Sequence, residues 1–263
     1  MATSLPEKVR NRNLVVGTFI RLPSVPMLQA LLAVDECWLD FIVIDAQHQA
    51  INDETVAQLI TLSVAQGVGT MVRIAPNASW RAELMLDLGA DGVIFPVVNS
   101  QSDAQEAVSR CRYPTVGVRS VGGLAARAKG TPLPESDPLC VVQIETTQAV
   151  SNAAAILQTP GVDALLMGPV DLSRSMGINF GYGNFTAARE AVNEVASKIE
   201  AMATAAGVSV LRHCQSEQEV HDAIETGATC VTISTDVSML QSAVKQWGSY
   251  IREAGTRLGT AGV

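Results

Sequence analysis

The chain has 263 residues, a formal net charge of −8 and 48% hydrophobic residues. A chain with this negative balance is not attracted to nucleic acid or to an anionic membrane surface, so neither is expected as a partner. The five cysteines include no C-x-x-C pair, the N-terminus is too polar for a secretory signal, and no apolar run is long enough for a membrane helix. These features predict a cytoplasmic protein that handles small molecules.

Short apolar runs alternate with helical patterns along the chain. The runs lack polar alternation, which is typical of parallel strands covered on their outer face. The predicted strands are 14–20, 41–44, 70–74, 92–95, 139–144, 162–167, 208–211 and 230–233. The predicted helices lie near 24–32, 53–65, 79–88, 102–111, 147–158, 186–206, 217–225 and 237–253.

Eight strand–helix units in a chain of about 250 residues favour a closed (β/α)8 TIM barrel over an open doubly wound sheet. No G-x-G-x-x-G motif follows the first strand, which weakens a dinucleotide-binding interpretation further. We predict one α/β barrel domain over 1–263, with tails at 1–13 and 255–263. Residues 113–138 break the alternation, and a loop of this length in a compact domain is usually functional or disordered.

Two predicted strands stop at a carboxylate. Glu145 ends one strand, and Asp171 follows Gly168-Pro169 after the next. Buried like charges are costly unless a positive group lies between them, and hard oxygen ligands with open positions suit Mg²⁺ or Mn²⁺. The pair therefore indicates a metal site, although capping of the following helices would explain the same spacing.

Other ionisable residues follow strand ends, where a barrel enzyme places its chemistry. Asp45 and His48 are three residues apart after the second strand and could form an acid–base dyad, although a lone loop histidine is often plain surface. Arg73 interrupts an apolar strand and needs an anionic partner, either a substrate oxyanion or Asp45. His213 and Cys214 end the seventh strand, but no second His or Cys has the spacing of a soft metal site.

The ordered set of motifs resembles the HpcH/HpaI class II aldolase family over residues 14 to 253. The motifs that carry the resemblance are Gly17-Thr-Phe, Ile44-Asp-Ala-Gln-His48, Val72-Arg73, Arg112-Tyr-Pro-Thr-Val-Gly-Val-Arg119, Gln143-Ile-Glu145 and Gly168-Pro-Val-Asp-Leu-Ser173. The resemblance implies a barrel of the phosphoenolpyruvate/pyruvate type that cleaves 4-hydroxy-2-oxo acids to pyruvate and an aldehyde. The bond cleavage leaves a pyruvate enolate, whose charge a divalent cation and a guanidinium can both stabilise.

The resemblance also implies a role for each site residue. Glu145 and Asp171 would hold Mg²⁺, Mn²⁺ or Co²⁺, and Arg73 would stabilise the enolate oxygen. Asp45 and His48 would move protons. The remaining substrate-binding positions are Gln143 beside the metal, the backbone amides of Val170 and Asp171, Gln47, and Arg119 in the loop from Gly117 to Thr131, which also holds Arg127.

One position departs from the family pattern, because Asp-x-Glu-His is replaced by Asp45-Ala-Gln47-His48. The loss of that carboxylate changes the charge beside His48 and puts the aldehyde range and the direction of the reaction in doubt. Two alternatives therefore stay open, namely decarboxylation of oxaloacetate through the same enolate and an oxo-acid-binding barrel without turnover. The family further implies a homohexamer, a trimer of dimers, in which the helix near 237–253, with Trp247, is exchanged between partners.

Overall fold

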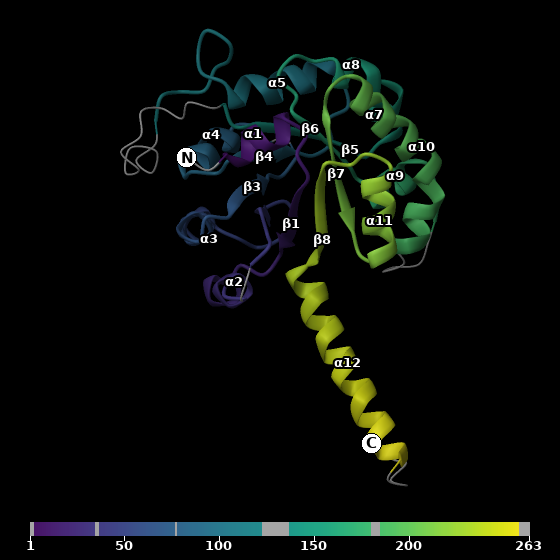
Figure 1. The fold of residues 1–263 in the computed structure, drawn as a ribbon. Helices are drawn as coiled ribbons and strands as arrows, with labels where there is room; N and C mark the ends of the chain where they lie inside the picture. Colours follow the sequence, from purple (N-terminus) through teal and green to yellow (C-terminus); the bar gives the residue numbers. More distant parts are fainter. Residues whose placement is uncertain (1–2, 35–36, 77, 123–136, 180–184, 258–263) are drawn as a thin grey trace.

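Eight parallel strands form a closed barrel in sequence order in the computed structural model, which describes residues 3–34, 37–76, 78–122, 137–179 and 185–257 (Figure 1). The strands are β1 (Val15–Ile20), β2 (Phe41–Asp45), β3 (Gly69–Arg73), β4 (Gly92–Phe95), β5 (Leu139–Ile144), β6 (Ala164–Met167), β7 (Ser209–Cys214) and β8 (Cys230–Thr235). The predicted (β/α)8 barrel is confirmed.

The chain also forms helices, most of which surround the barrel as its outer layer (Figure 1). They are α1 (Leu5–Arg10), α2 (Val25–Leu32), α3 (Asp53–Ala65), α4 (Arg81–Asp87), α5 (Gln101–Cys111), α7 (Thr147–Ser151), α8 (Ala153–Leu157), α9 (Pro169–Ser175), α10 (Phe185–Ala205), α11 (Glu217–Glu225) and α12 (Asp236–Arg257). Several begin at a residue whose side chain accepts a hydrogen bond from the first turn, as Ser24, Asn52 and Ser216 do. Such caps satisfy amides that the helix itself leaves unpaired.

The apolar residues form two separate layers. One cluster fills the barrel interior and includes Phe19, Val43 and Ile94. The larger cluster lies between the strands and the helices and includes Ile42, Ile44 and Val93. Because neighbouring residues of a strand point to opposite faces, this division shows which residues point into the barrel.

Two helices were not expected from the sequence. The predicted tail at 1–13 contains α1, which Ser4 and Glu7 start with a capping box. Its buried Leu5 and Val9 belong to the interior cluster, so α1 packs against the end of the barrel where the strands begin. The short α9 follows β6 directly and carries Asp171 in its first turn. Residues 258–263 of the predicted C-terminal tail lie outside the described residues.

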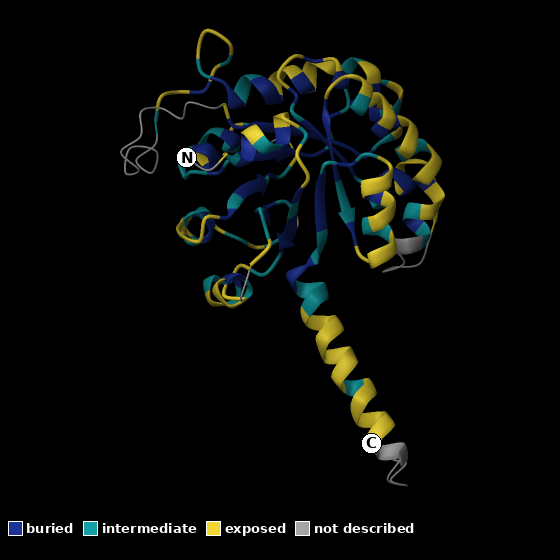
Figure 2. Cartoon of the chain, in the orientation of Figure 1, coloured by how far each residue is buried: buried dark blue, intermediate teal, exposed yellow. Residues whose placement is uncertain are grey.

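The last helix, α12, leaves the end of β8 and extends away from the barrel (Figure 1). Most of its length is exposed (Figure 2). The exposed residues include Leu240, Val244, Trp247 and Ile251, spaced so that they share one face of the helix. No helix in the described parts of the chain is both long and apolar enough to span a membrane.

Candidate active site

Asp45 and Arg73 end neighbouring strands and meet at the mouth of the barrel. The register pairs them directly across β2 and β3. The guanidinium of Arg73 donates two hydrogen bonds to the carboxylate of Asp45, from Nε to Oδ1 at 3.1 Å and from Nη2 to Oδ2 at 2.9 Å. Such a bidentate ion pair fixes the plane of the guanidinium as well as its position.

Phe19 and Arg21 flank this ion pair from β1 and its end. The Arg73 guanidinium carbon lies 5.1 Å from the centroid of the Phe19 ring, so the two side chains make a cation–π contact. The Nε of Arg21 lies 3.8 Å from Oδ2 of Asp45, which is too long for a hydrogen bond. The mouth therefore carries two guanidinium groups around one buried carboxylate.

Glu145 follows β5 and is buried at the same mouth. Its Oε1 accepts a hydrogen bond of 2.8 Å from the backbone amide of Val97, and its Oε2 accepts one from the side-chain amide of Gln143. Val97 adopts a φ of 55°, in the left-handed region that few branched residues occupy. This strained turn after β4 aims the Val97 amide at Glu145, and the apolar side chain offers no sequence signal for that role.

Gly168 lies between Glu145 and the start of α9. A Cβ on Gly168 would lie 2.6 Å from the Cβ of Glu145, 2.7 Å from Oε2 of Glu145 and 3.0 Å from Nε2 of Gln143. Only glycine leaves this space free, and the sequence motif contains it without revealing the reason. Asp171 follows in the first turn of α9 and is exposed to solvent.

The two buried carboxylates have opposite pKa shifts. Burial, strengthened by the charge of Asp171, raises the pKa of Glu145 to about 7, although Val97, Gln143 and Arg73 act against the shift. Burial would also raise the pKa of Asp45, but the hydrogen bonds and charge of Arg73 outweigh it and hold the pKa below its usual value. Asp45 therefore already has its counter-cation, whereas no ion pair joins Glu145 to a cation among the described residues.

The family profile described as HpcH/HpaI aldolase/citrate lyase matches residues 19–243. The chain belongs to this family. A 4-hydroxy-2-oxo-heptane-1,7-dioate aldolase of Salmonella arizonae is 32% identical over 208 residues, which cover 76% of this chain and 77% of that relative. As an HpcH/HpaI protein with relatives named as aldolases, the chain is a carbon–carbon lyase.

Solved structures agree with this assignment. An HpcH/HpaI aldolase from Desulfitobacterium hafniense is 27% identical with a TM-score of 0.80, covering 96% of this chain and 98% of that one. Citrate synthase SbnG is 25% identical with a TM-score of 0.83, covering 97% of this chain and 100% of that one. The similar structures thus include more than one type of HpcH/HpaI chemistry.

The residues around Glu145 fit the divalent cation that the HpcH/HpaI family implies. Oε1 of Gln143 is a buried acceptor without a hydrogen-bond partner among the described residues, next to a carboxylate whose pKa burial raises. These are hard oxygen donors, which suit Mg²⁺ or Mn²⁺. No cluster of three or more His, Cys, Asp or Glu occurs in the described parts of the chain.

The Asp45–His48 loop differs from the expected dyad. Oδ1 of Asp45 accepts hydrogen bonds from the backbone amides of Gln47 at 3.2 Å and His48 at 3.4 Å, not from the imidazole ring. His48 is exposed, and Oε1 of Gln47 is buried without a partner among the described residues. Asp45 thus shapes the loop and holds Arg73, while the side chain of His48 is exposed to solvent.

Arg119 lies apart from the mouth in a single chain. Its buried guanidinium donates a 2.9 Å hydrogen bond to Asp87 and stacks on Tyr113, with 4.7 Å to the ring centroid. Asp87 ends α4, and the C-terminal ends of barrel helices lie opposite the mouth. One chain therefore brings together Asp45, Arg73, Gln143 and Glu145 but not Arg119, and Arg127 lies outside the described residues.

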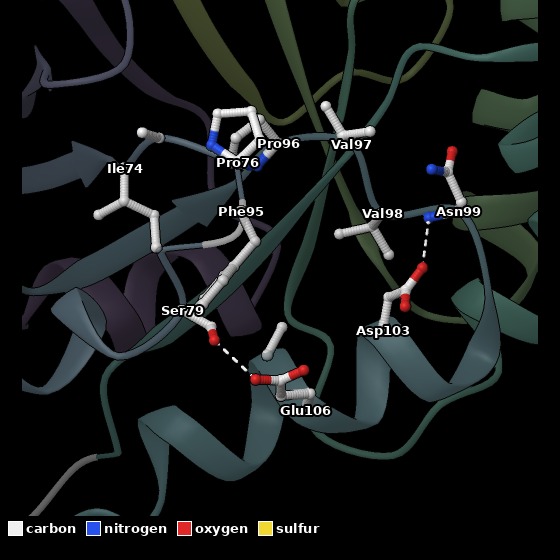
Figure 3. Close-up of a pocket in the computed structure, with 12 residues that line it drawn as sticks. Ile74, Pro76, Ser79, Phe95, Pro96, Val97, Val98, Asn99, Asp103 and Glu106 are labelled. Atoms are coloured by element: carbon white, nitrogen blue, oxygen red, sulfur yellow. Dashed lines mark hydrogen bonds between the residues drawn. The ribbon is translucent and has the colours of Figure 1, made fainter.

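A pocket of about 230 Å³ lies beside the mouth, between the ends of β3 and β4 and the helix α5 (Figure 3). Its polar side chains include Asp103, which accepts from the backbone amide of Asn99, and Glu106, which accepts from Ser79. None of the described residues that line it is cationic. The pocket therefore suits an oxo-acid anion less well than the mouth with Arg73.

Proposed function

We propose that this HpcH/HpaI enzyme is a divalent-metal-dependent aldolase that reversibly cleaves 4-hydroxy-2-oxo acids to pyruvate and an aldehyde. One observation carries the proposal, namely that the uncompensated carboxylate of Glu145 and the fixed guanidinium of Arg73 lie at one barrel mouth. The carboxylate of Glu145 can bind a cation, and the guanidinium of Arg73 can stabilise an oxyanion. A pyruvate enolate needs both.

Glu145 and Asp171 would hold the cation, with Mg²⁺, Mn²⁺ and Co²⁺ as candidates, and Oε1 of Gln143 lies beside them as a further acceptor. When bound, the cation neutralises charge on the oxo-acid oxygens. The backbone amides of Val170 and Asp171 belong to the first turn of α9, where amides lack partners within the helix, and they would receive the substrate carboxylate.

Arg73 would donate to the keto oxygen of the substrate as negative charge develops there. In the cleavage direction the 4-hydroxyl loses its proton, the C3–C4 bond breaks, and its electrons enter the enolate while C4 becomes the aldehyde carbon. The enolate then takes up a proton at C3. His48 is the proposed proton carrier, and Asp45 orients Arg73 and the loop that presents His48.

Gln47 and Arg119 are also proposed to contact substrate. The buried Oε1 of Gln47 can accept a hydrogen bond from substrate. Because a glutamine carries no charge, His48 lacks the neighbouring carboxylate of the usual motif. Within its own chain Arg119 is paired with Asp87, away from the mouth. The proposed contact is therefore between Arg119 of one subunit and a substrate in the mouth of a neighbouring subunit.

Decarboxylation of oxaloacetate is the second candidate, since loss of carbon dioxide from oxaloacetate leaves the same pyruvate enolate. The resemblance to citrate synthase SbnG supports a second candidate only in that chains of this fold carry out more than one carbon–carbon bond reaction. The two reactions would share Glu145 and Arg73. They differ in whether an aldehyde is formed.

The apolar face of α12 supports an oligomer in which this helix packs on another copy. Trp247 is 67% exposed and Val244 66% exposed, while α12 contacts its own barrel chiefly at β1 and β8. A large exposed apolar stripe marks an interaction surface. An exchanged helix within a hexamer, arranged as a trimer of dimers, would cover it.

Hydrogen–deuterium exchange at the methyl group of pyruvate tests the enolate chemistry directly. With added Mg²⁺ or Mn²⁺ we expect exchange in the wild type, loss of exchange on chelation, and loss in Glu145→Gln. The matched control is Glu106→Gln, whose carboxylate accepts from Ser79 in the neighbouring pocket. Wild-type exchange in Glu145→Gln would refute the metal assignment, and the product formed from oxaloacetate or from pyruvate plus aldehydes separates the two reactions.

A further inference from the structure

His213 lies at the mouth although the chemistry proposed above does not use it. It follows the interior residue Leu211 by two positions on β7, so its side chain also points into the barrel. Its ring stands edge-on to Phe19, with centroids 5.3 Å apart and planes at 79°. Because Phe19 also supports Arg73, the imidazole lies on the floor of the same mouth.

A hydroxyl group holds the imidazole from the next strand. The register pairs His213 with Thr232 of β8, and Nδ1 of His213 lies 3.1 Å from Oγ1 of Thr232. Within the described parts of the chain, no hydrogen bond to Nε2 is present. The ring therefore has a fixed orientation and one free polar atom at a site with partial solvent contact.

The surrounding charges keep this imidazole neutral. Burial, together with the positive charges of Arg189, Arg73 and Arg21, lowers the pKa of His213 to about 3. Arg189 is itself paired with Glu219, and Arg73 with Asp45. A neutral imidazole can donate or accept at Nε2, depending on which tautomer Thr232 selects.

His213 lies on a part of the mouth wall that the proposed binding of the oxo-acid half does not use. In the proposed function the oxo-acid half is held by residues after β3, β5 and β6. The wall formed by β7, β8 and β1 is available to the remainder of the substrate, and it presents Nε2 of His213. An apolar substituent would displace water from this atom and leave it without a hydrogen-bond partner, which is unfavourable for a partly buried polar group.

We infer that His213, held by Thr232, is a specificity-determining residue that hydrogen-bonds a hydroxyl group on the aldehyde half of the substrate. A hydroxyl can accept from Nε2 or donate to it, so it satisfies either tautomer. The preferred second substrate is therefore a hydroxyaldehyde rather than an alkyl aldehyde. The inference rests on the proposed aldolase function.

The test compares glycolaldehyde with acetaldehyde, which differ by one hydroxyl, as partners of pyruvate with Mn²⁺ present. We expect the wild type to prefer glycolaldehyde in kcat/KM and His213→Phe to lower that preference by ~10- to 100-fold. Thr232→Val should act in the same direction by a smaller factor, and it serves alone if His213→Phe does not fold. The matched control is His221→Phe on α11, because that side chain is 67% exposed.

The outcomes separate the inference from the proposed function. If pyruvate exchanges its methyl protons but the variants keep the wild-type preference, the inference fails and the aldolase proposal stands. If the wild type shows neither exchange nor an aldol product, calorimetry decides instead, with 4,5-dihydroxy-2-oxopentanoate against 4-hydroxy-2-oxopentanoate. Tighter binding of the dihydroxy acid that disappears in His213→Phe supports the inference, and equal affinities in both proteins overturn it.

Discussion

Gly168 and Glu145 are so close that no side chain fits between them. A Cβ on Gly168 would lie 2.6 Å from the Cβ of Glu145, an atom that cannot move without the backbone, and 2.7 Å from Oε2. Glu145 is held from its other side by the Val97 amide. A methyl group here must therefore displace the carboxylate or the start of α9.

Gly168→Ala should leave the barrel folded but impair the metal site. A small displacement of a ligand costs metal affinity, and we expect the apparent Kd for Mn²⁺ to rise by ~10- to 100-fold, as for loss of a supporting partner. The change is measured by calorimetric titration of Mn²⁺, with circular dichroism to check the fold. Gly177→Ala is the control at an open position, although its φ of 75° adds local strain. An unchanged Kd would show that Gly168 does not shape the site.

The pKa of Glu145 predicts how the stability of the metal-free enzyme depends on pH. Because the folded-state pKa of about 7 lies above the usual value of 4.5, the folded state binds the extra proton between those values. The free energy of unfolding contributed by this group is then greatest below about pH 4.5 and falls as pH rises through about 7, by roughly 3 kcal/mol in all. Glu145→Gln removes this slope.

Urea unfolding in the presence of a chelator, between about pH 5 and 8, measures the effect. The control is again Glu106→Gln, which should keep the wild-type slope. Parallel curves for the wild type and Glu145→Gln would mean that the carboxylate ionises normally in the folded protein.

The ion pair of Arg73 with Asp45 predicts that the planar geometry of the guanidinium contributes to catalysis as much as its positive charge does. Lysine in place of Arg73 keeps the cation but cannot make both hydrogen bonds to Asp45 or stack its plane on Phe19. We expect Arg73→Lys to lower kcat of the aldol reaction by ~100- to 1,000-fold, as for loss of an oxyanion donor. Arg110→Lys, on α5 and paired with Glu83, is the control. A change confined to KM would place Arg73 in substrate binding alone.

The barrel was predictable from the sequence because its strands are short apolar runs separated by helical patterns. Because both faces of these strands are apolar, the sequence does not indicate which residues point into the barrel. In Phe41-Ile-Val-Ile44 both faces are apolar, so the sequence cannot distinguish the interior cluster from the outer one. For this reason the contact of Phe19 with His213, from strands at opposite ends of the chain, was not foreseen.

The candidate site was predictable where a charged residue interrupts or ends an apolar strand, as Arg73 and Glu145 do. It was not predictable where the backbone performs the role. The amide of Val97 acts through an unusual φ, and Gly168 acts through the side chain it lacks. Burial also decides whether Asp45 contacts the ring of His48 or its backbone amide, and sequence spacing does not contain that information.

Arg119 is predicted to stabilise the fold rather than to set KM in a single subunit. Its guanidinium is buried against Asp87 and Tyr113. Removing one member of a buried ion pair typically lowers the free energy of unfolding by about 3–5 kcal/mol. Arg119→Met should therefore lower Tm in any assembly state, whereas KM for pyruvate and the aldehyde should stay near the wild-type value wherever a subunit acts alone, because the substrate contact proposed for Arg119 is with another subunit's site. A raised KM with unchanged Tm would instead support the sequence-based assignment of Arg119 to substrate binding.

The exposed face of α12 predicts an assembly that depends on apolar contact. Leu240, Val244, Trp247 and Ile251 share one helix face, and burying them against another copy would stabilise association through the hydrophobic effect. We expect Val244→Glu combined with Trp247→Glu to reduce the molar mass below that of the wild-type assembly, proposed to be a hexamer, measured by light scattering after gel filtration. Two carboxylates on this face would have to be desolvated on association, whereas they remain hydrated in the free chain.

Ser242→Glu is the matched control for this change, because Ser242 is exposed two residues from Leu240 and lies away from the apolar face. It adds negative charge to the same helix without entering the expected contact, so the molar mass should stay that of the wild type. Since the described contacts between α12 and its own barrel are chiefly with β1 and β8, the double variant should keep a folded barrel by circular dichroism. A double variant with the wild-type mass would show that this face is not the interface between copies.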